Sequence, residues 1–446
     1  MSEKKKIYKP SPISGFPEWT PDVRLVEQQW LDHIRAVFES YGYCNIETPA
    51  IEALEVIAAK GEDVDKEIYV LERLQADEDD KKEARLALHF DQTVPLARYV
   101  AQHFNDLIFP FKRYQMQKVW RGERPQAGRF REFYQCDIDV INVDNLPLHF
   151  DAEMPAIIWQ ILSSLPGMED EKIQIRISNR KILLGWLEHL GVENQIDVIR
   201  IVDKVEKLDS NKILHLLEET GITRDTAEEI LKVGQTKVTR KEDVLKIAPQ
   251  MQGTGSLMQE GIEELAFVMD QLSHLPEGAV VADLSIVRGL DYYTGTVYET
   301  VFVDDPGYGS ICSGGRYDDL ASNYINKKLP GVGISIGFSR LFARILQKQQ
   351  LPTGKHSPAD IMVVMPNEEQ RGVATETANI LRGKGLNVEL AHGGKLKKQL
   401  ATAEKKGIPY IWFPPFEDGL PHEVKDMSSG EQTEADPAQW TPKKES

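Results

Sequence analysis

The sequence has few cysteines and no long apolar run. Its 446 residues include three cysteines, Cys44, Cys136 and Cys312, which lie far apart along the chain. This spacing excludes a disulfide scaffold and a CxxC metal site, and it predicts a protein of the reducing cytoplasm. The longest uncharged stretch, residues 154–168, is too short and too polar for a bilayer-spanning helix, so no membrane partner is expected. The opening MSEKKKIYKP lacks the apolar segment of a secretory signal.

Positive charge is also scarce. The chain has 53 Lys plus Arg against 70 Asp plus Glu, which gives a net charge of −17. This balance excludes a protein that coats DNA through bulk charge, so DNA is not an expected partner, but it allows a local basic patch that grips a nucleic acid. A hydrophobic content of 41% and a charged content of 28% are ordinary for a globular enzyme, and the length predicts two or three domains.

The clearest strand pattern lies between residues 111 and 142. Apolar and polar residues alternate along two segments separated by RPQAGR, which predicts an antiparallel hairpin with one core face and one polar face. A solvated outer face is the simplest explanation of the polar row. The row contains arginine and phenylalanine but no lysine, however, and this favours a ligand-binding floor. Its members are Arg113, Gln115, Gln117, Arg121 and Glu123 on the first strand, and Phe133, Gln135, Asp137 and Asp139 on the second.

The periodicity along the chain predicts its division into domains. Residues 21–42 have the three- and four-residue apolar spacing of a helix, and Leu-, Glu- and Lys-rich helical stretches replace strands in the middle of the chain. Strand and helix patterns then alternate as βαβ units after a linker near residue 351. We therefore predict a catalytic domain in two parts, 1–194 and 276–350, a helical insertion over 195–275, and an α/β domain over 358–446.

Three motifs carry residues suited to binding a nucleotide and a small polar ligand. In the hairpin, arginines can fork onto phosphates, Glu123 can accept from an adenine amino group and Phe133 can stack on a base. No GxxxxGK[ST] loop is present, so side chains would hold the phosphates. The second motif is RGLDYYTG from Arg288, and the third is GVGISIGFSRL from Gly331, where glycines permit close approach. A structural strand and an exposed Arg340 remain the simpler alternatives for these two.

Together these motifs resemble those of the histidyl-tRNA synthetases, which are class II aminoacyl-tRNA synthetases. The helix 21–42 with ETP is similar to class II motif 1, VWRGE…GRFREFYQCDID to motif 2 and GISIGFSRL to motif 3. RGLDYYTG and GGRYD resemble two histidine-specific signatures, and WFPPFEDG…HEVKDMSSGEQ resembles an anticodon-binding domain. The resemblance implies an α/β fold with an α+β catalytic core: an antiparallel sheet flanked by helices, a helical insertion and a C-terminal α/β anticodon-binding domain.

The resemblance also implies roles for individual residues. Arg121 and Arg288 would be the catalytic residues on opposite sides of the reacting phosphate, and Asp139 and Tyr293 would contact the imidazole. Residues that would bind histidine are Asp91, Gln92, Thr93, Arg121, Gln135, Asp139, Arg288, Tyr292 and Tyr293. Those that would bind ATP are Arg121, Glu123, Arg129, Phe133 and Arg340.

The implied reaction has two steps. The carboxylate of L-histidine attacks the α-phosphorus of ATP and pyrophosphate leaves, and the terminal ribose hydroxyl of tRNA(His) then attacks the adenylate and releases AMP. Because the attacking carboxylate is already ionised, catalysis is alignment plus cationic stabilisation, which two arginines and Mg²⁺ can supply.

Two macromolecular contacts are expected. Motif 1 forms the dimer interface of class II enzymes, so we predict a homodimer in which a partner covers Trp30 and Val37 of the apolar stripe. We predict that Lys397 and Lys398 bind tRNA phosphates, on a helix over residues 395–406. Leu396, Leu400 and Ala403 would dock this helix on its sheet.

Two departures and one alternative accompany the resemblance. Motif 3 usually reads Glu-Arg, whereas Ser339 precedes Arg340 here, so the partner of that arginine stays open. The segment ADPAQWTPKKES has two prolines and is not expected to form the closing helix, so the cover of the last sheet edge is also open. The alternative is a non-catalytic relative, the regulatory subunit of ATP phosphoribosyltransferase. Its loss of ligand-binding residues and of the third domain does not match this sequence.

Overall fold

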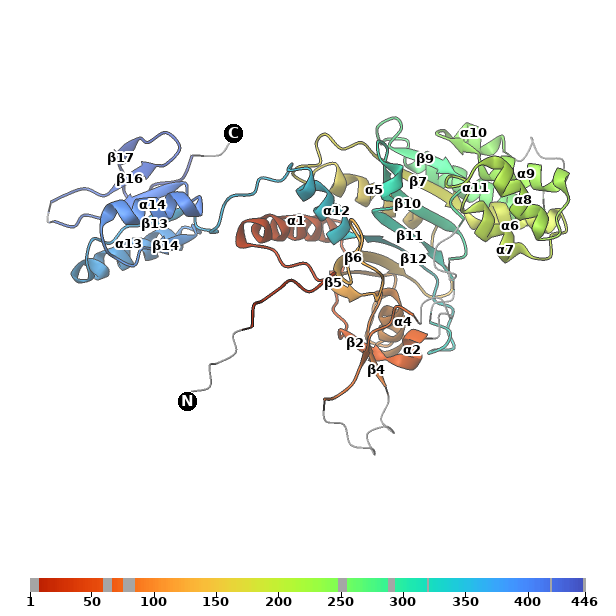
Figure 1. Cartoon of the computed structure of the whole chain (residues 1–446), viewed down its shortest axis with the longest axis horizontal. Coiled ribbons are helices and arrows are strands. Elements are labelled where there is room, and N and C mark those ends of the chain that lie inside the picture. The colour runs from red at the N-terminus through yellow and green to blue at the C-terminus, as the bar shows by residue number, and fades with distance from the viewer. Residues whose placement is uncertain are drawn as a thin grey trace. The chain divides into compact units, whose positions relative to one another are not determined.

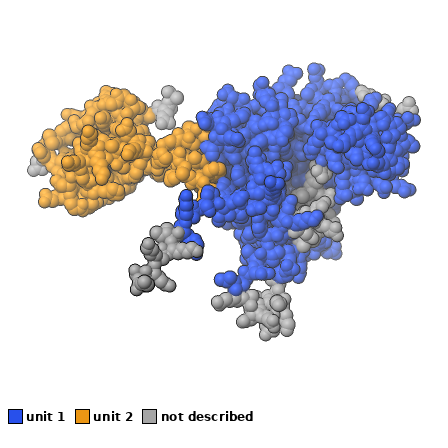
Figure 2. Space-filling model, in the orientation of Figure 1, with its two compact units in different colours: residues 1–17, 31–350 blue, residues 18–30, 351–446 orange. Residues whose placement is uncertain are grey.

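The computed structural model describes residues 8–58, 66–74, 85–247, 255–287, 293–318, 321–417 and 419–443. The chain divides into two compact units, one of Met1–Pro17 with Leu31–Gln350 and one of Glu18–Trp30 with Leu351–Ser446 (Figure 2). Both units combine helices with sheets, which confirms the predicted α/β class. No described helix is both long enough and apolar enough to cross a membrane.

A large, mostly antiparallel sheet forms the centre of the first unit (Figure 1). Helices α5 (His149–Leu162), α11 (Ser256–Gln271) and α12 (Phe338–Gln347) pack against β12, β7 and β6 respectively. Only β1 with β5 and β7 with β9 run parallel among the pairs in this sheet that the structure describes. Its strands, in spatial order, are β1 (Cys44–Asn45), β5 (Phe111–Trp120), β6 (Glu132–Ile141), β12 (Gly331–Ile336), β11 (Cys312–Tyr317), β10 (Thr296–Phe302), β7 (Ile173–Asn179), β9 (Val280–Asp283) and β8 (Lys237–Val238).

The predicted hairpin is the β5–β6 pair. Its ladder runs from Phe111 opposite Ile141 to Trp120 opposite Glu132. Arg113 therefore lies opposite Asp139, and both are buried, with exposed fractions of 0% and 5%. A solvated outer face is thus the wrong explanation for Arg113 and Asp139 of the polar row, because their side chains lie inside the protein.

A small three-stranded sheet precedes this hairpin in the chain. It places β4 (Leu86–Leu88) between β2 (Ile51–Ala53) and β3 (Val70–Leu71), next to α2 (Leu54–Ala58). Helix α4 (Thr93–Gln102) follows β4 after four residues and delivers the Asp91–Thr93 segment to the central sheet.

Helices dominate residues 195–271, at the right of Figure 1. Helices α8 and α9 begin at Asp209 and Thr223, whose side chains accept hydrogen bonds from backbone N–H groups of the first turn. Leu and Ile side chains of α6 to α9 form a separate buried cluster. The segment is not wholly helical, because β8 adds an edge strand to the central sheet. Its other helices are α7 (Gln195–Val202), α8 (Ser210–Glu219), α9 (Arg224–Gly234) and α10 (Lys241–Leu245), and α6 (Arg180–His189) precedes them.

The second unit contains a mixed sheet in the order β14–β13–β15–β16–β17. Strands β13 (Ile361–Val363), β14 (Val388–Leu390) and β15 (Tyr410–Phe413) are parallel, as their βαβ pattern predicts, and α13 (Arg371–Gly383) and α14 (Leu396–Lys406) connect them. Two antiparallel strands were not predicted, β16 (Glu423–Asp426) and β17 (Gln432–Glu434). Two short 3₁₀ helices complete the described elements, Pro306–Tyr308 and Glu368–Gln370.

Two details of this unit concern the sequence predictions. Residues 435–443 form no helix, as expected, and Trp440 instead packs against Tyr410 and Trp412 with ring centroids 5.0 Å and 5.5 Å apart. The predicted docking of α14 is wrong at Leu396, which is 42% exposed. It is confirmed at Ala403, which is buried, and at Leu400, which packs against the same core cluster. Gln399 adds a further contact, since its amide bonds both the N–H and the carbonyl of Met365 at 2.9 Å and 2.7 Å.

The apolar stripe of α1 (Pro21–Ser40) is already covered within the chain. Trp30 is 0% exposed and Val37 is 7% exposed. These two side chains are therefore not available to a partner, and the prediction that a partner covers them is wrong.

Candidate active site

Two adjoining cavities lie along β6. The inner one has a volume of about 20 Å³ and the outer one about 270 Å³, and both are lined by Ser313 and Ser335. The inner cavity is further lined by Thr93, Asp137, Asp139, Tyr293, Tyr317, Gly333 and Ile334. The outer cavity is further lined by Arg121, Glu123, Gly128, Arg129, Phe130, Phe133, Gln135, Ser310, Ile311, Gly337 and Arg340. One strand thus connects an acidic recess with a cation-rich opening.

Asp139 is held rigidly at the inner end. Its Oδ2 lies 2.6 Å from Nη2 of Arg113 on the neighbouring strand, and its Oδ1 accepts a hydrogen bond of 3.0 Å from the Tyr317 hydroxyl. The Arg113 nitrogens make no well-directed hydrogen bond to the described residues, so this contact is an ion pair rather than a bidentate fork. Burial raises the pKa of Asp139 to about 6, against the opposing effect of Arg113.

Asp137 lies two residues earlier on the same face. It is 5% exposed, and burial raises its pKa to about 7, partly offset by Arg113 and by a hydrogen bond from Ser335. The hydroxyl of Ser335 also accepts a hydrogen bond of 2.9 Å from Nε2 of Gln135. Gln135, Asp137 and Ser335 therefore form one polar chain along the boundary between the two cavities.

The glycines of the third motif make room for these groups. A Cβ on Gly333 would lie 2.0 Å from Oδ1 of Asp139, and one on Gly331 would lie 2.3 Å from the ring of Tyr317. The expectation that these glycines permit close approach is confirmed. Any larger residue at either position would displace a side chain of the inner cavity.

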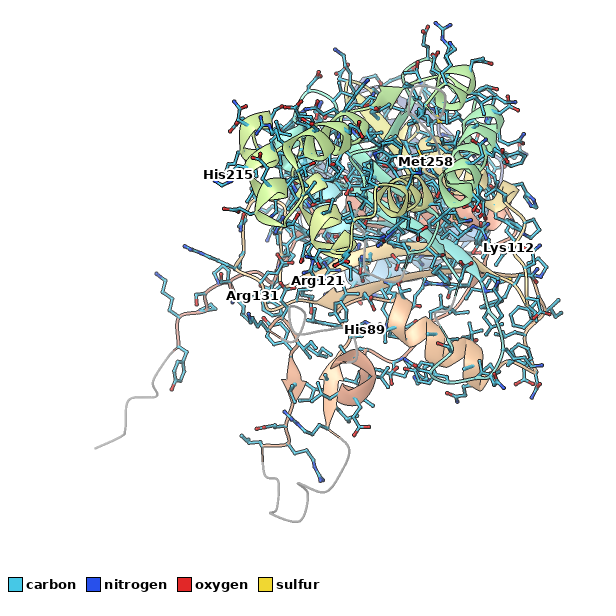
Figure 3. All side chains as sticks on the ribbon, turned by 90° about the vertical axis from the view of Figure 1, so that its right-hand side faces the viewer. His89, Lys112, Arg121, Arg131, His215 and Met258 are labelled. Carbon is cyan, nitrogen blue, oxygen red and sulfur yellow. The ribbon has the colours of Figure 1, made fainter. Side chains whose placement is uncertain are left out.

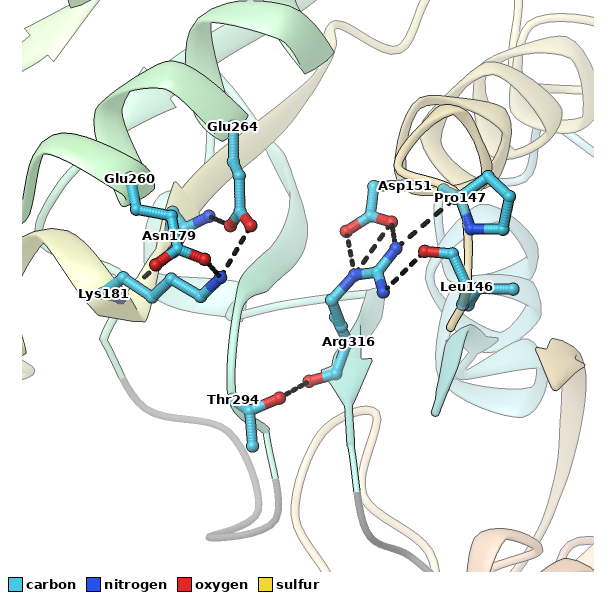
Figure 4. A network of polar contacts seen from close by, with 9 residues as sticks. All are labelled: Leu146, Pro147, Asp151, Asn179, Lys181, Glu260, Glu264, Thr294 and Arg316. Carbon is cyan, nitrogen blue, oxygen red and sulfur yellow. Dashed lines mark hydrogen bonds and ion pairs between the residues drawn. The ribbon is translucent and has the colours of Figure 1, made fainter. Parts of the chain in front are cut away.

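The arginine of the GGRYD segment, Arg316, is held by a network of polar contacts (Figure 4). Nε of Arg316 donates to Oδ1 of Asp151 at 3.0 Å, and its Nη1 donates to the Leu146 carbonyl at 3.1 Å. This buried pair ties β11 to the first turn of α5. Because Tyr317 follows Arg316 in the strand, the pair also fixes the hydroxyl that contacts Asp139.

Arg121 and its neighbours line the outer cavity. The guanidinium of Arg121 lies 5.2 Å from the centre of the Phe133 ring, and its Nε donates to the Phe90 carbonyl at 3.1 Å. A backbone hydrogen bond of 2.9 Å joins Arg121 to Arg131, and Figure 3 shows these two arginines close together at the end of the hairpin. Glu123 pairs with Arg129 at 3.2 Å.

The structure identifies a partner for Arg340. Its Nη2 donates to the Tyr308 carbonyl, and its guanidinium lies 5.0 Å from the centre of the Tyr308 ring. The Tyr308 hydroxyl in turn donates to the Arg340 carbonyl at 2.8 Å. Ser339 is turned away and accepts a hydrogen bond of 2.9 Å from the Tyr134 N–H. Tyr308 therefore positions Arg340, whose partner the sequence left open.

The remaining residues predicted to bind histidine do not all line the inner cavity. Thr93 and Tyr293 line the inner cavity. Asp91 accepts a hydrogen bond of 3.1 Å from the Val94 N–H at the start of α4, and Gln92 donates its amide to the carbonyls of Gln117 and Gln135. Arg288 and Tyr292 lie outside the described residues.

Three residues of the site had no assigned role in the sequence reasoning. Arg113 and Asp137 belonged to the polar row but had no partner there, and Tyr317 lay in a signature without a stated function. The absence of lysine from the row was the available signal for the first two. Among the described residues, no group of three or more His, Cys, Asp or Glu side chains could hold a metal ion.

The basic cluster of α14 lies on the surface of the second unit. Lys397 and Lys398 are exposed and have no ion-pair partner within the described chain, whereas Lys406 pairs with Glu389. The expectation of water-facing lysines is thus met at these two positions.

Comparison with known proteins gives the same family throughout. The histidyl-tRNA synthetase family model matches residues 15–341, and an anticodon-binding domain model matches residues 360–435. A histidine–tRNA ligase of Thermobifida fusca is 54% identical over 99% of this chain and 100% of that protein, and one of Micrococcus luteus is 45% identical over 96% of each. The crystal structure of histidyl-tRNA synthetase from Nostoc sp. PCC 7120 is similar with a TM-score of 0.85 and 39% identity, covering 96% of this chain and 97% of that one.

A more distant structure shares the fold alone. It is described as an ATP phosphoribosyltransferase regulatory subunit/histidyl-tRNA synthetase from Bacillus halodurans, with a TM-score of 0.71 and 20% identity, covering 89% of this chain and 97% of that one.

Proposed function

The chain belongs to the histidyl-tRNA synthetase family, and from this we propose that it is a histidine–tRNA ligase. It activates L-histidine with ATP to histidyl-adenylate and transfers the histidine to the 3′ end of tRNA(His). The observation that carries the proposal is the pair of adjoining cavities along β6. An acidic recess suits the nitrogen atoms of histidine, and a cation-lined opening suits the phosphates of ATP.

In the outer cavity, Arg121 would contact the α-phosphate and the substrate carboxylate. Phe133 would stack on the adenine, Glu123 would accept from its amino group, and Arg129 and Arg340 would bind the outer phosphates. Arg288 would complete the cationic set from the opposite side. These side chains stabilise charge that develops on the phosphate oxygens, and no proton transfer is needed.

Mg²⁺ would accompany ATP rather than occupy a protein cage. Mg²⁺ commonly binds through one or two carboxylates together with substrate phosphates. Since Glu123 is assigned to the adenine, the phosphates would hold the ion, with the hydroxyls of Ser310 and Ser313 as the neighbouring oxygen ligands in the outer cavity. When bound, the ion would neutralise charge on the phosphates.

In the inner cavity, Asp139 and Tyr293 would contact the imidazole. Asp91, Gln92, Thr93 and Gln135 would surround the amino group, with Tyr292 in the same pocket. A neutral imidazole has one donor and one acceptor nitrogen, and a carboxylate with a hydroxyl complements that pair.

The C-terminal unit would bind tRNA. We assign residues 358–446 as the anticodon-binding domain, 1–194 and 276–350 as the catalytic domain, and 195–275 as the insertion. Lys397 and Lys398 would meet tRNA phosphates, because a chain of charge −17 needs local positive charge there.

The protein would act as a homodimer in the cytoplasm. Exposed apolar side chains on the small sheet could form part of the interface, and they include Ile51, Val70, Leu71 and Leu86. Three free cysteines are compatible with a reducing compartment. A mass near one chain by light scattering of the active protein would contradict the dimer.

One assay tests the function. ATP–pyrophosphate exchange should depend on added histidine and on no other amino acid. In a separate reaction with labelled histidine, the label should become attached to tRNA(His). A regulatory subunit would give no exchange under any condition. The presence of Arg121 and Glu123 in the outer cavity, and of the anticodon-binding domain, favours the ligase over that alternative.

A further inference from the structure

Asp137 has a free acceptor atom inside the inner cavity. Its side chain is 95% buried, and its Oδ1 has no hydrogen-bond partner among the described residues. Buried polar atoms are nearly always paired, so an unpaired carboxylate oxygen that faces a cavity indicates a ligand. Asp137 was not among the residues assigned to histidine above.

The neighbours of Asp137 do not satisfy this oxygen. Gln115 lies opposite it on β5, but its amide donates to Thr48 Oγ1 at 3.0 Å and to Gln117 Oε1 at 2.6 Å. Ser335 lies opposite it on β12 and occupies only one side of the carboxylate. Arg113 makes its ion pair with Asp139 instead.

Two further acceptors of the same region are also unpaired. Oε1 of Gln92 and Oε1 of Gln135 are buried and have no partner among the described residues. Gln135 is joined to Asp137 through Ser335, and the amide of Gln92 donates to the Gln135 carbonyl at 3.1 Å. Three linked side chains therefore each present one free acceptor oxygen.

The charged side chains around the inner cavity favour the binding of a cation. Asp137 and Asp139 line this cavity, and the one buried guanidinium beside them, that of Arg113, pairs with Asp139. If both carboxylates are ionised, one negative charge is left without a counter-charge, which is unfavourable inside a protein unless a ligand supplies the positive charge.

We propose that Asp137 is a further specificity residue for histidine, whose Oδ1 binds the α-ammonium group together with Gln92 and Gln135. An ammonium has three donors and no acceptor, so it suits unpaired acceptor oxygens, and Gln135 lines the adjoining outer cavity. Asp139 has both oxygens engaged by Arg113 and Tyr317 and serves the imidazole. The assignment rests on the proposed function, because it takes histidine as the ligand of this cavity.

Two isosteric variants separate the roles of the two carboxylates. Asp137→Asn should weaken the binding of histidine by roughly 10- to 100-fold, the loss typical of a hydrogen bond to a charged group. It should leave unchanged the binding of imidazolepropionate, which has the imidazole and the carboxylate but no amino group. The matched control Asp139→Asn should weaken both ligands. Calorimetric titration of each purified protein measures all four changes.

The pH dependence gives a second readout. Burial raises the pKa of Asp137 to about 7, so histidine should bind more tightly to the wild-type protein as pH rises through this value and Asp137 ionises. Asp137→Asn should flatten that part of the profile, while the titration of free histidine affects both proteins equally. The groups that act on Asp137 are Arg113, Ser335, Asp139 and Asp91.

The outcomes are distinguishable. Equal losses for histidine and imidazolepropionate in Asp137→Asn would assign this residue to the imidazole and overturn the proposal. Unchanged histidine binding would overturn it as well, as would a lower thermal midpoint accompanied by equal losses for histidine and ATP. If the wild-type protein itself shows no histidine-dependent pyrophosphate exchange, the proposed function is refuted instead.

Discussion

The inner and outer cavities balance their charges in different ways. In the inner cavity, Asp139 is paired with Arg113 and Tyr317 before any ligand arrives. In the outer cavity, Arg121 rests on Phe133, and Arg340 is held by the carbonyl and ring of Tyr308. The inner groups are thus preorganised for selection of a side chain, whereas Arg121 and Arg340 of the outer cavity keep their charge for phosphates. We expect changes in the outer cavity to affect the rate of activation and changes in the inner cavity to affect histidine binding.

The largest effect should come from the cations at the reacting phosphate. Arg288→Ala should lower the rate of histidine-dependent pyrophosphate exchange by at least about 10²- to 10³-fold with little change in thermal midpoint, because its proposed role is stabilisation of transition-state charge. Arg288→Lys should restore part of the rate, since lysine cannot fork onto two oxygens. Arg200→Ala, at an arginine of α7 that is 57% exposed, is the control. Exchange at the wild-type rate in Arg288→Ala would end the assignment.

A large but different effect is expected at the inner cavity. Asp139→Asn should raise the KM for histidine by roughly 100-fold, because a buried polar group of the substrate would lose its partner, and should leave the KM for ATP nearly constant. Asparagine is the better test, since Asp139→Ala would leave Arg113 buried without a counter-charge, at a cost of about 3–5 kcal/mol in the free energy of unfolding.

Tyr317→Phe is the milder companion of that variant. It removes only the hydroxyl that contacts Oδ1 of Asp139, so the KM for histidine should rise less than in Asp139→Asn. Steady-state exchange at varied histidine and varied ATP separates the two constants. A parallel rise in both constants for Asp139→Asn would show that this residue supports the structure instead of selecting the substrate.

A smaller effect should follow from loosening Arg340. Tyr308→Ala removes the ring against which the guanidinium packs, and it should raise the KM for ATP by about tenfold, the scale of one cation–π contact at a partly buried site. Tyr308→Phe keeps the ring and the backbone carbonyl, so its effect should be weaker. Initial rates of exchange measure both variants. If the KM for histidine rises as much as that for ATP, Tyr308 does not act through the phosphate-binding cations.

Changes at the surface of the second unit should have no effect on histidine activation. Lys397→Glu combined with Lys398→Glu should weaken aminoacylation of tRNA and flatten its dependence on salt, because fewer counterions would be released on binding. Pyrophosphate exchange needs no tRNA and should not change. The same charge reversal at Lys232 and Lys246 of the insertion is the control, and equal losses in both pairs would indicate bulk charge rather than a local site.

The sequence predicted the elements of the site better than their contacts. Alternation along residues 111–142 gave the hairpin and its polar face, because strand periodicity is local. It did not give the ion pair of Arg113 with Asp139, which depends on the register of the hairpin. Tyr317 and Asp139 are 178 residues apart, so no local pattern could join them.

The second unit shows the same limit. Its βαβ strands were predicted because they are apolar and buried, whereas β16 and β17 are short and mostly polar and have no comparable pattern. The docking of α14 was predicted from apolar spacing, and it holds at Leu400 and Ala403 but not at Leu396. The apolar spacing could not predict the bonds from the amide of Gln399 to the backbone of Met365, because they depend on the tertiary fold.

The contact between Trp412 and Trp440 has a spectroscopic consequence. Their rings are 5.5 Å apart and inclined at 74°, and Tyr410 packs against Trp440 as well. Two indoles this close couple their electronic transitions, so the pair should give the second unit its own near-ultraviolet circular dichroism. Trp440→Phe would remove that signal, and the difference spectrum would report the unfolding of this unit separately from that of the rest of the chain.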